Sequence, residues 1–473
     1  MVATSGDRTA VPGTYWVWLG GTALSLLGVQ AMAFAMAWSA AGQGARFAAL
    51  VPTAIVLPRV VLLLVGGVVA DRFGAWLVLF ASTAAMMVVT VALAAAAWST
   101  LDLRLPLLLT ALAIGTVDAF QLPSSGSMPR RLVPPSALAR ALSARQLAGQ
   151  LALFAGPPLG GVLLGAAGLA GAALTNTATF LAMLAVLLIV RSAAGRPPDA
   201  SPGRGRSPQV VPAHDQSPQA VTVCGRSPEP AAAHGRSLKA GTYRGRSSDA
   251  RTAGDGGTGS GSPASAAVDG LRLAWSVPVL RAALLVTGVV AGFLLPVGTL
   301  LVPLLARQRG WSPSATGAVV AAMALGTAVV GVGVLLRGAS RRPGVVAAVG
   351  LLVAAAGVIM LAVGSAPLPA ALAGVLVGVG SGGFATHVGP LVLAATPLTH
   401  LARVQSVLVL VQSLPLLVTA NAFGLVAGAA HVPAVLYGCA GVLAVTGLAA
   451  LAVPTLRRSS GDSAPAGVRR RDI

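Results

Sequence analysis

Residues 66–74 read Gly-Gly-Val-Val-Ala-Asp-Arg-Phe-Gly, so that an apolar helix runs directly into an acid, a base and a glycine before another apolar helix begins. Asp71, at a helix end, can accept hydrogen bonds from the N-terminus of a neighbouring helix and stabilise its positive dipole end. Arg72 can bind another acid or a lipid phosphate. The turn therefore predicts either a conformational latch between helices or a charge pair that only sets topology.

The composition around this turn indicates a membrane protein. Of the 473 residues, 55% are hydrophobic and 9% are charged, whereas soluble domains carry roughly 25% charged residues. Apolar runs of about 20 residues recur, each long enough to cross a hydrocarbon core of roughly 30 Å as a helix. The formal charge of +20 falls between these runs and at the chain ends, which favours an orientation signal over nucleic-acid binding.

Twelve apolar runs form two blocks of six, as in a transporter built from two parallel-related halves. We expect an all-α membrane protein with twelve transmembrane helices in two six-helix, pseudo-symmetric bundles. The expected spans are 16–40, 46–70, 76–98, 105–127, 140–165 and 169–190, followed by 279–306, 312–337, 344–363, 368–396, 402–429 and 433–455.

The domain organisation follows from these blocks. Residues 192–277 are rich in Gly, Ser, Pro and Arg and carry a ten-residue repeat that reads Gly-Arg-Ser four times and Asp-Gln-Ser at 215–217, which predicts a disordered linker. The remaining expected parts are an N-terminal tail (1–15), the two bundles (16–191 and 278–456) and a basic tail (457–473).

The distribution of arginine predicts the orientation. If both termini are cytoplasmic, 15 of the 20 Lys and Arg residues outside the segment from Arg191 to Arg281 lie on the inner side. We therefore expect a multi-pass protein of the plasma (inner) membrane with both termini inside, and anionic lipid at the cytoplasmic arginines. We expect a monomer.

The turn at 66–74 resembles the loop between the second and third helices of the major facilitator superfamily, usually written G-x-L-A-D-R-x-G-R-R. The match extends to Gly74, and Ala75 and Trp76 replace two bases. The resemblance implies that Gly67, Asp71, Arg72 and Gly74 hold the two halves together on the cytoplasmic side in the outward-open state. An Asp71→Asn variant should insert normally and transport poorly; unchanged transport would contradict the latch.

Residues 337–342, Arg-Gly-Ala-Ser-Arg-Arg, occupy the corresponding place in the second block. This segment has kept the bases of the first turn and lost its acid. We interpret it as a diverged copy of the first turn that arose by internal duplication.

A second motif, Gly156-Pro157-Pro158-Leu159-Gly160-Gly161, matches the core G-P-x-x-G-G pattern of drug/proton antiporters. Proline bends the helix and the glycines allow a neighbour to pack closely. Gly156, Pro157, Gly160 and Gly161 are therefore candidates for an antiporter helix, with plain helix packing as the alternative.

Two charges fall deep inside expected spans, where ionisable groups are costly. Asp118 is the one acid within a span, and Arg59 is the one base deep in a span. Each precedes a cytoplasmic marker by twelve residues, so both lie roughly 18 Å from the inner face and can pair. A permanent pair is structural, whereas a pair that opens when Asp118 takes a proton is a coupling switch.

Polar residues at helical spacing predict a substrate cavity, although hydrogen bonding between helices explains them equally well. The candidates are Gln30, Trp38, Gln121, Gln146, Gln150, His387, Gln405 and Gln412.

Within the superfamily, the first block is similar to the bacterial group that includes the enterobactin exporter. The similarity rests on Leu57-Pro58-Arg59, Asp118-Ala119-Phe120 and residues 128–134. It implies export of a siderophore, a macrolide or a similar drug-like hydrophobic compound.

We expect a secondary transporter that works by alternating access with proton antiport. The alternatives are an importer or uniporter of a small solute, and a non-transporting sensor or assembly protein. No nucleotide-binding loop, catalytic constellation or metal-ligand pattern occurs, and the two cysteines, Cys224 and Cys439, do not form a framework. An enzyme, a cofactor and a metal are therefore not expected.

Overall fold

The computed structural model describes residues 11–99, 102–193, 275–338, 340, 342–396, 401–429 and 431–452, all of which belong to one compact unit. The expected linker lies almost wholly outside these ranges, as do its repeats and the basic tail. Within the described helices, the side chains of 63–68, 70, 71, 193, 393, 394, 401–403, 405 and 406 are also outside the description.

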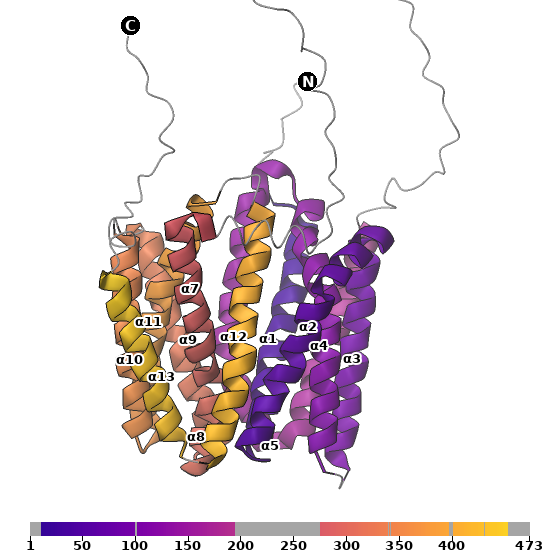
Figure 1. The fold of residues 1–473 in the computed structure, drawn as a ribbon. Helices are drawn as coiled ribbons and strands as arrows, with labels where there is room; N and C mark the ends of the chain where they lie inside the picture. Colours follow the sequence, from indigo (N-terminus) through magenta and orange to yellow (C-terminus); the bar gives the residue numbers. More distant parts are fainter. Residues whose placement is uncertain are drawn as a thin grey trace, which may run out of the picture. The chain divides into compact units, whose positions relative to one another are not determined.

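Every regular element over the described ranges is helical. The first block contains α1 (Gly13–Ala41), α2 (Ala45–Phe73), α3 (Ala75–Trp98), α4 (Arg104–Leu132), the 3-10 turn η1 (Pro135–Ala137) and α5 (Leu138–Ala193). The second contains α7 (Pro278–Phe293), the π-helical turn η2 (Val297–Leu301), α8 (Val302–Gln308), α9 (Pro313–Arg337), α10 (Pro343–Val363), α11 (Pro367–Ala394), α12 (Leu401–Ala429) and α13 (Val432–Ala452). Figure 1 shows the two blocks in their respective colours, indigo to magenta and rose to yellow.

Eleven helical stretches of the described chain are long and apolar enough to cross a membrane. One of them, the 58-residue stretch Pro135–Ser192, is twice the necessary length. Its chain reverses at Gly168, where φ is 64° and ψ is −168°, a conformation that only glycine adopts without strain. The stretch is therefore two spans, and the count of twelve in two six-helix bundles is confirmed.

The two halves share a backbone feature at the charged turn. Gly74, between α2 and α3, has φ 86°, and Gly338, between α9 and α10, has φ 81°. A side chain at either position would be strained, so both turns need glycine. The backbone conformation has thus been retained in the second half although the acid has not.

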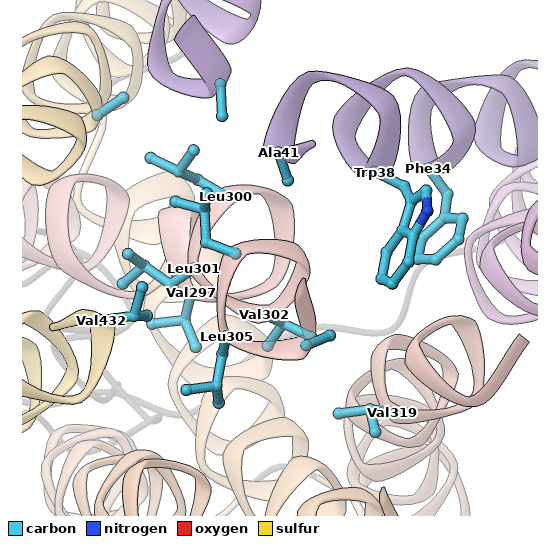
Figure 2. Close-up of a cluster of buried hydrophobic side chains, with 14 of the residues drawn as sticks. Phe34, Trp38, Ala41, Val297, Leu300, Leu301, Val302, Leu305, Val319 and Val432 are labelled. Atoms are coloured by element: carbon cyan, nitrogen blue, oxygen red, sulfur yellow. The ribbon is translucent and has the colours of Figure 1, made fainter. Parts of the chain in front are cut away.

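The hydrophobic core joins the halves at one end of the bundle, which we call the α1–α2 end because it holds the turn at 42–44. Its largest cluster combines Phe34 and Trp38 of α1 with Leu301 of η2 and Val319 of α9. Figure 2 shows these side chains, with α1 facing η2 and α8. The two halves are therefore packed together at this end.

At the opposite end, which holds the turns at Gly74 and Gly338, the core is divided. One cluster contains residues of the first half, among them Tyr15, Trp18 and Met128. Another contains residues of the second half, among them Leu280 and Val404. Over the described residues, each half thus has its own core at this α2–α3 end.

Candidate functional site

A cavity of about 490 Å³ lies between the two halves. Helices α1 to α5 form its wall on one side, and α7, η2, α8, α9, α11 and α12 form the other. Its volume falls within the range of small-molecule sites. A pocket that both halves build, and that the packed core closes at the α1–α2 end, suits a site with alternating access.

Apolar side chains make up most of the cavity wall. Phe34 and Phe180 contribute aromatic rings, while Met32, Met86 and Met323 contribute thioethers. Methionine is flexible and polarisable, so it adapts to apolar ligands of different shapes. The wall is therefore suited to the body of a hydrophobic organic molecule.

The cavity also contains an ion pair. Arg59 on α2 donates from Nη2 to Oδ2 of Asp118 on α4. Their side chains keep 36% and 20% of their exposure, respectively, so the pair lies at the cavity surface. The two charges that the sequence places at one depth are thus brought into contact.

Several neutral polar groups of the lining are already engaged. The hydroxyl of Thr90 donates to Met86 O at 3.0 Å, and that of Thr299 donates to Leu295 O at 3.1 Å. Thr327 donates to Gly378 O at 3.1 Å. Among the neutral polar side chains, the amide of Gln30, the amide nitrogen of Asn176 and the hydroxyl of Ser381 are left for a ligand; Oδ1 of Asn176 accepts from Thr179.

The other candidate cavity residues are dispersed. Trp38 packs under Arg307, whose guanidinium lies 4.2 Å from its ring centroid. His387 is buried near α10, with Nδ1 3.0 Å from Gly383 O and Nε2 3.4 Å from the amide nitrogen of Ser340. Neither residue lines the cavity, and nor does Gln121.

Three of the remaining glutamines are not part of the described cavity lining. Gln146 and Gln150 on α5 and Gln412 on α12 are exposed, and the side chain of Gln405 lies outside the described residues. Gln146 and Gln150 share a helix face with Leu153 and Pro157, which do line the cavity. The glutamine face of α5 therefore continues the cavity wall toward the α2–α3 end.

The Gly-Pro motif packs α5 against both halves. A side chain at Gly160 would meet Ala31 O of α1 at 2.3 Å, and one at Gly161 would meet Pro313 O of α9 at 2.5 Å. Gly156 lies equally close to Gln30. Gly160 and Gly161 thus permit backbone contacts, and Gly156 a contact with Gln30 Cβ, that no larger residue allows.

The latch residues are described only in part. The side chains of Gly67 and Asp71 lie outside the described residues. Arg72 is exposed, with its guanidinium 5.6 Å from the Phe73 ring centroid. The partner of Asp71, and therefore the latch itself, stays a prediction.

Two features of the site were not predicted from the sequence. The π-helical turn η2 presents Gly298 and Thr299 to the cavity, and such turns are frequent at functional sites. The flanking prolines, Pro296 and Pro303, are the sequence feature that could have indicated an irregular turn here. Asn176 lies within an Ala- and Thr-rich span, and its cavity-facing position has no local signature.

Comparison with known proteins identifies a transporter family. A family model described as "Major Facilitator Superfamily" matches residues 18–420. No curated protein sequence matches.

Solved transporter structures resemble the chain at the level of the fold. A POT family transporter in complex with 5-aminolevulinic acid aligns with a TM-score of 0.64 and 11% identity, covering 94% of this chain and 97% of that one. The nucleoside transporter NupG aligns at 0.60 and 10%, covering 93% and 99%. A bacterial homolog of the human lysosomal transporter Spinster, in an inward-facing and unoccupied conformation, aligns at 0.59 and 15%, covering 95% and 97%.

Proposed function

Because the chain belongs to the Major Facilitator Superfamily, and is therefore a multi-pass membrane transporter and not an enzyme, we propose that it exports a small hydrophobic organic compound in exchange for protons. The observation that carries this proposal is the mostly apolar cavity of about 490 Å³ between the halves, with one ion pair in its wall. The apolar wall binds the body of the substrate, and the ion pair provides the titratable group.

Proton coupling is supported by the position of Asp118. It lies in contact with Arg59 and at the cavity surface, where a proton can reach it. When a proton neutralises the carboxylate, the charge-assisted bond to Arg59 weakens and the cavity changes charge. Substrate leaves and the proton enters on the outer side, and the proton is released on the inner side as the pair re-forms.

The direction of transport is supported by the motif around Gly156. Its similarity to the antiporter pattern favours export, and its glycines place α5 against α1 and α9 at the cavity. Because this helix has such close contacts to both halves, a shift of α5 on substrate binding would change the packing at the α1–α2 end. With the termini cytoplasmic, as the arginine distribution predicts, the α1–α2 end is the outer one.

With that orientation, this conformation is closed outside, and the divided core at the α2–α3 end belongs to the inner side. Anionic lipid would then bind the arginines of that inner side. We propose that the chain works in the plasma membrane as a monomer.

The second candidate is an importer or uniporter of a small solute. It is favoured by the scarcity of acids in the spans, since Asp118 is the one acid among the described residues that line the cavity. A non-transporting sensor on the same scaffold would bind a ligand without moving it.

The test is uptake of macrolides, siderophores and dyes into inverted vesicles, with and without a proton gradient. Export by antiport predicts accumulation that collapses to the passive level when the gradient is removed. Uptake that a gradient of either sign leaves unchanged would support a uniporter. Absence of flux for compounds that bind would support a sensor.

A further inference from the structure

We propose that the substrate is net-neutral and carries an adjacent hydrogen-bond donor and acceptor, as an amide or a hydroxyl does, and that this group binds the Arg59–Asp118 pair. The inference rests on the proposed transport function and narrows the chemical class of its substrate. It follows from the charge and the unused hydrogen-bonding capacity of the pair.

The charge of the cavity favours a neutral ligand. Arg59 and Asp118 are the charged residues among the described lining, and their charges compensate each other. A ligand with a net charge would bring an uncompensated ion into an otherwise apolar cavity, which is costly. A neutral molecule avoids this cost.

The pair has unused hydrogen-bonding capacity, because a single hydrogen bond joins Arg59 to Asp118. Of the three guanidinium nitrogens of Arg59, Nη2 alone has a hydrogen-bond partner among the described residues; Nε is buried, so the donors open to a ligand are those on Nη1 and the second N–H of Nη2. On Asp118, Oδ2 accepts that bond and Oδ1 accepts none from the described residues. A guanidinium has five N–H donors and a carboxylate can accept several bonds, so the pair can donate and accept at once.

The single contact also determines the geometry of the ligand group. A donor directed at Asp118 and an acceptor directed at Arg59 must lie next to each other, because the two side chains already touch. A primary amide and a hydroxyl have this arrangement. Such a group would add to the existing bond without displacing it.

The rest of the lining supplies weaker recognition, because the groups left for a ligand there, Gln30, Ser381 and the amide nitrogen of Asn176, are neutral, whereas the pair is charged. The hydroxyls of Thr90, Thr299 and Thr327 donate to backbone carbonyls, so they have little left for a ligand. The amide of Asn176 already accepts from Thr179 at 3.3 Å. The ion pair is therefore the main polar anchor, and the Met and Phe side chains contact the apolar remainder.

The proposal is tested by calorimetric titration of the full chain in lipid nanodiscs, with empty nanodiscs subtracted. Four probes share one naphthalene body: 2-naphthamide, 2-ethylnaphthalene, the 2-naphthoate anion and the 2-naphthylmethylammonium cation. We expect the amide to bind about tenfold tighter than each of the others, as for hydrogen bonds to charged groups. Tighter binding of either ion, equal binding of all four, or binding of none would overturn the proposal.

An Arg59→Lys variant separates pairing from recognition. Lysine keeps the charge and can bind Asp118, but it lacks the planar fork that presents further donors. We expect the amide preference over 2-ethylnaphthalene to disappear in this variant and to persist in Arg191→Lys, an exposed arginine on α5. A preference unchanged in a folded Arg59→Lys protein would contradict the proposal.

The two proposals fail in different ways. If Arg59→Lys does not fold, the four probes on the unaltered chain still decide the substrate class. Absence of gradient-driven flux with a clear amide preference would sink antiport export and leave the recognition intact. Gradient-driven flux with no preference among the probes would contradict the proposed recognition and leave antiport export intact.

Discussion

Arg59 and Asp118 show how two side chains that are 59 positions apart define a site. Each would be costly alone in a membrane span, because a charge in an apolar surrounding needs a partner. In contact they compensate each other, yet they keep exposure to the cavity. A structural pair and a coupling switch differ in whether this contact opens during transport.

Asp118→Asn should abolish gradient-driven transport. Asparagine keeps the shape of the side chain but cannot titrate, and it leaves Arg59 without a counter-charge. We expect substrate accumulation in energised vesicles to fall to the passive level, with exchange of substrate at zero gradient still measurable. Transport that still depended fully on the gradient would exclude Asp118 as the coupling site.

A double variant, Arg59→Gln with Asp118→Asn, is the matched control. It removes both charges, so the stability that Asp118→Asn alone loses should largely return, while coupling does not. Thermal unfolding in detergent measures the recovered stability, and gradient-driven uptake into vesicles measures the coupling. If the double variant also recovered coupling, the pair would be purely structural.

At the level of the helices, sequence reasoning predicted the elements closely. The second span was expected at 46–70 and runs over Ala45–Phe73; the tenth was expected at 368–396 and runs over Pro367–Ala394. Apolar length and the punctuation by Gly, Pro and Arg are local properties, which explains this agreement. The turn at Gly168 was expected as well, as the gap between 165 and 169.

The faces of the helices were harder to predict. In a soluble protein the buried face is the apolar one, but lipid is as apolar as a helix interface. The glutamines at 121, 146, 150 and 412 have helical spacing and yet do not line the cavity, whereas Gln30 does. Spacing alone therefore groups residues on a face without showing what that face contacts.

The glycine motif allows a prediction about helix packing. Gly161→Ala would place a Cβ 2.5 Å from Pro313 O, a backbone atom that cannot turn aside. We expect α5 and α9 to separate at the α1–α2 end, at a cost of about 1–3 kcal/mol and a roughly 5- to 150-fold change in the conformational equilibrium. Spin labels on α5 and α9 would measure the longer distance.

Gly165→Ala is the control for this variant. It lies one turn further along α5, where a Cβ would meet nothing within 4 Å. Its distance distribution and transport rate should match those of the unaltered chain. If Gly161→Ala behaved in the same way, the close contact would not restrain the two halves.

For the whole molecule, the contacts between halves gather at the α1–α2 end. Arg307 lies over Trp38 and donates to its carbonyl oxygen at 3.3 Å, and Asn421 donates to the hydroxyl of Thr53 at 2.7 Å. The clusters at the α2–α3 end each belong to one half. With the orientation predicted by the arginines, this is an inward-facing arrangement.

Labelling with a membrane-impermeant maleimide tests this arrangement, after Cys224 and Cys439 have been replaced by serine. Gln150→Cys should react in inverted vesicles and not in intact cells, because its face continues from the cavity wall toward the inner side. Leu151→Cys is also exposed but lies on a different face of α5, so it should be shielded by lipid. Arg46→Cys, exposed at the α1–α2 end, should react in intact cells. The reverse pattern would contradict the orientation.

By itself, the sequence determined the fold class, the twelve spans and the positions of the turns between them, because each depends on a short run of residues and on the thickness of a bilayer. The tertiary structure alone decided which polar groups meet. It brought Arg59 and Asp118, which the sequence places at one depth and allows to pair, into contact; it also placed Trp38 under Arg307 and brought Asn176 to the cavity. These contacts depend on how helices distant in the chain pack against one another, and in an apolar solvent no local pattern encodes that choice.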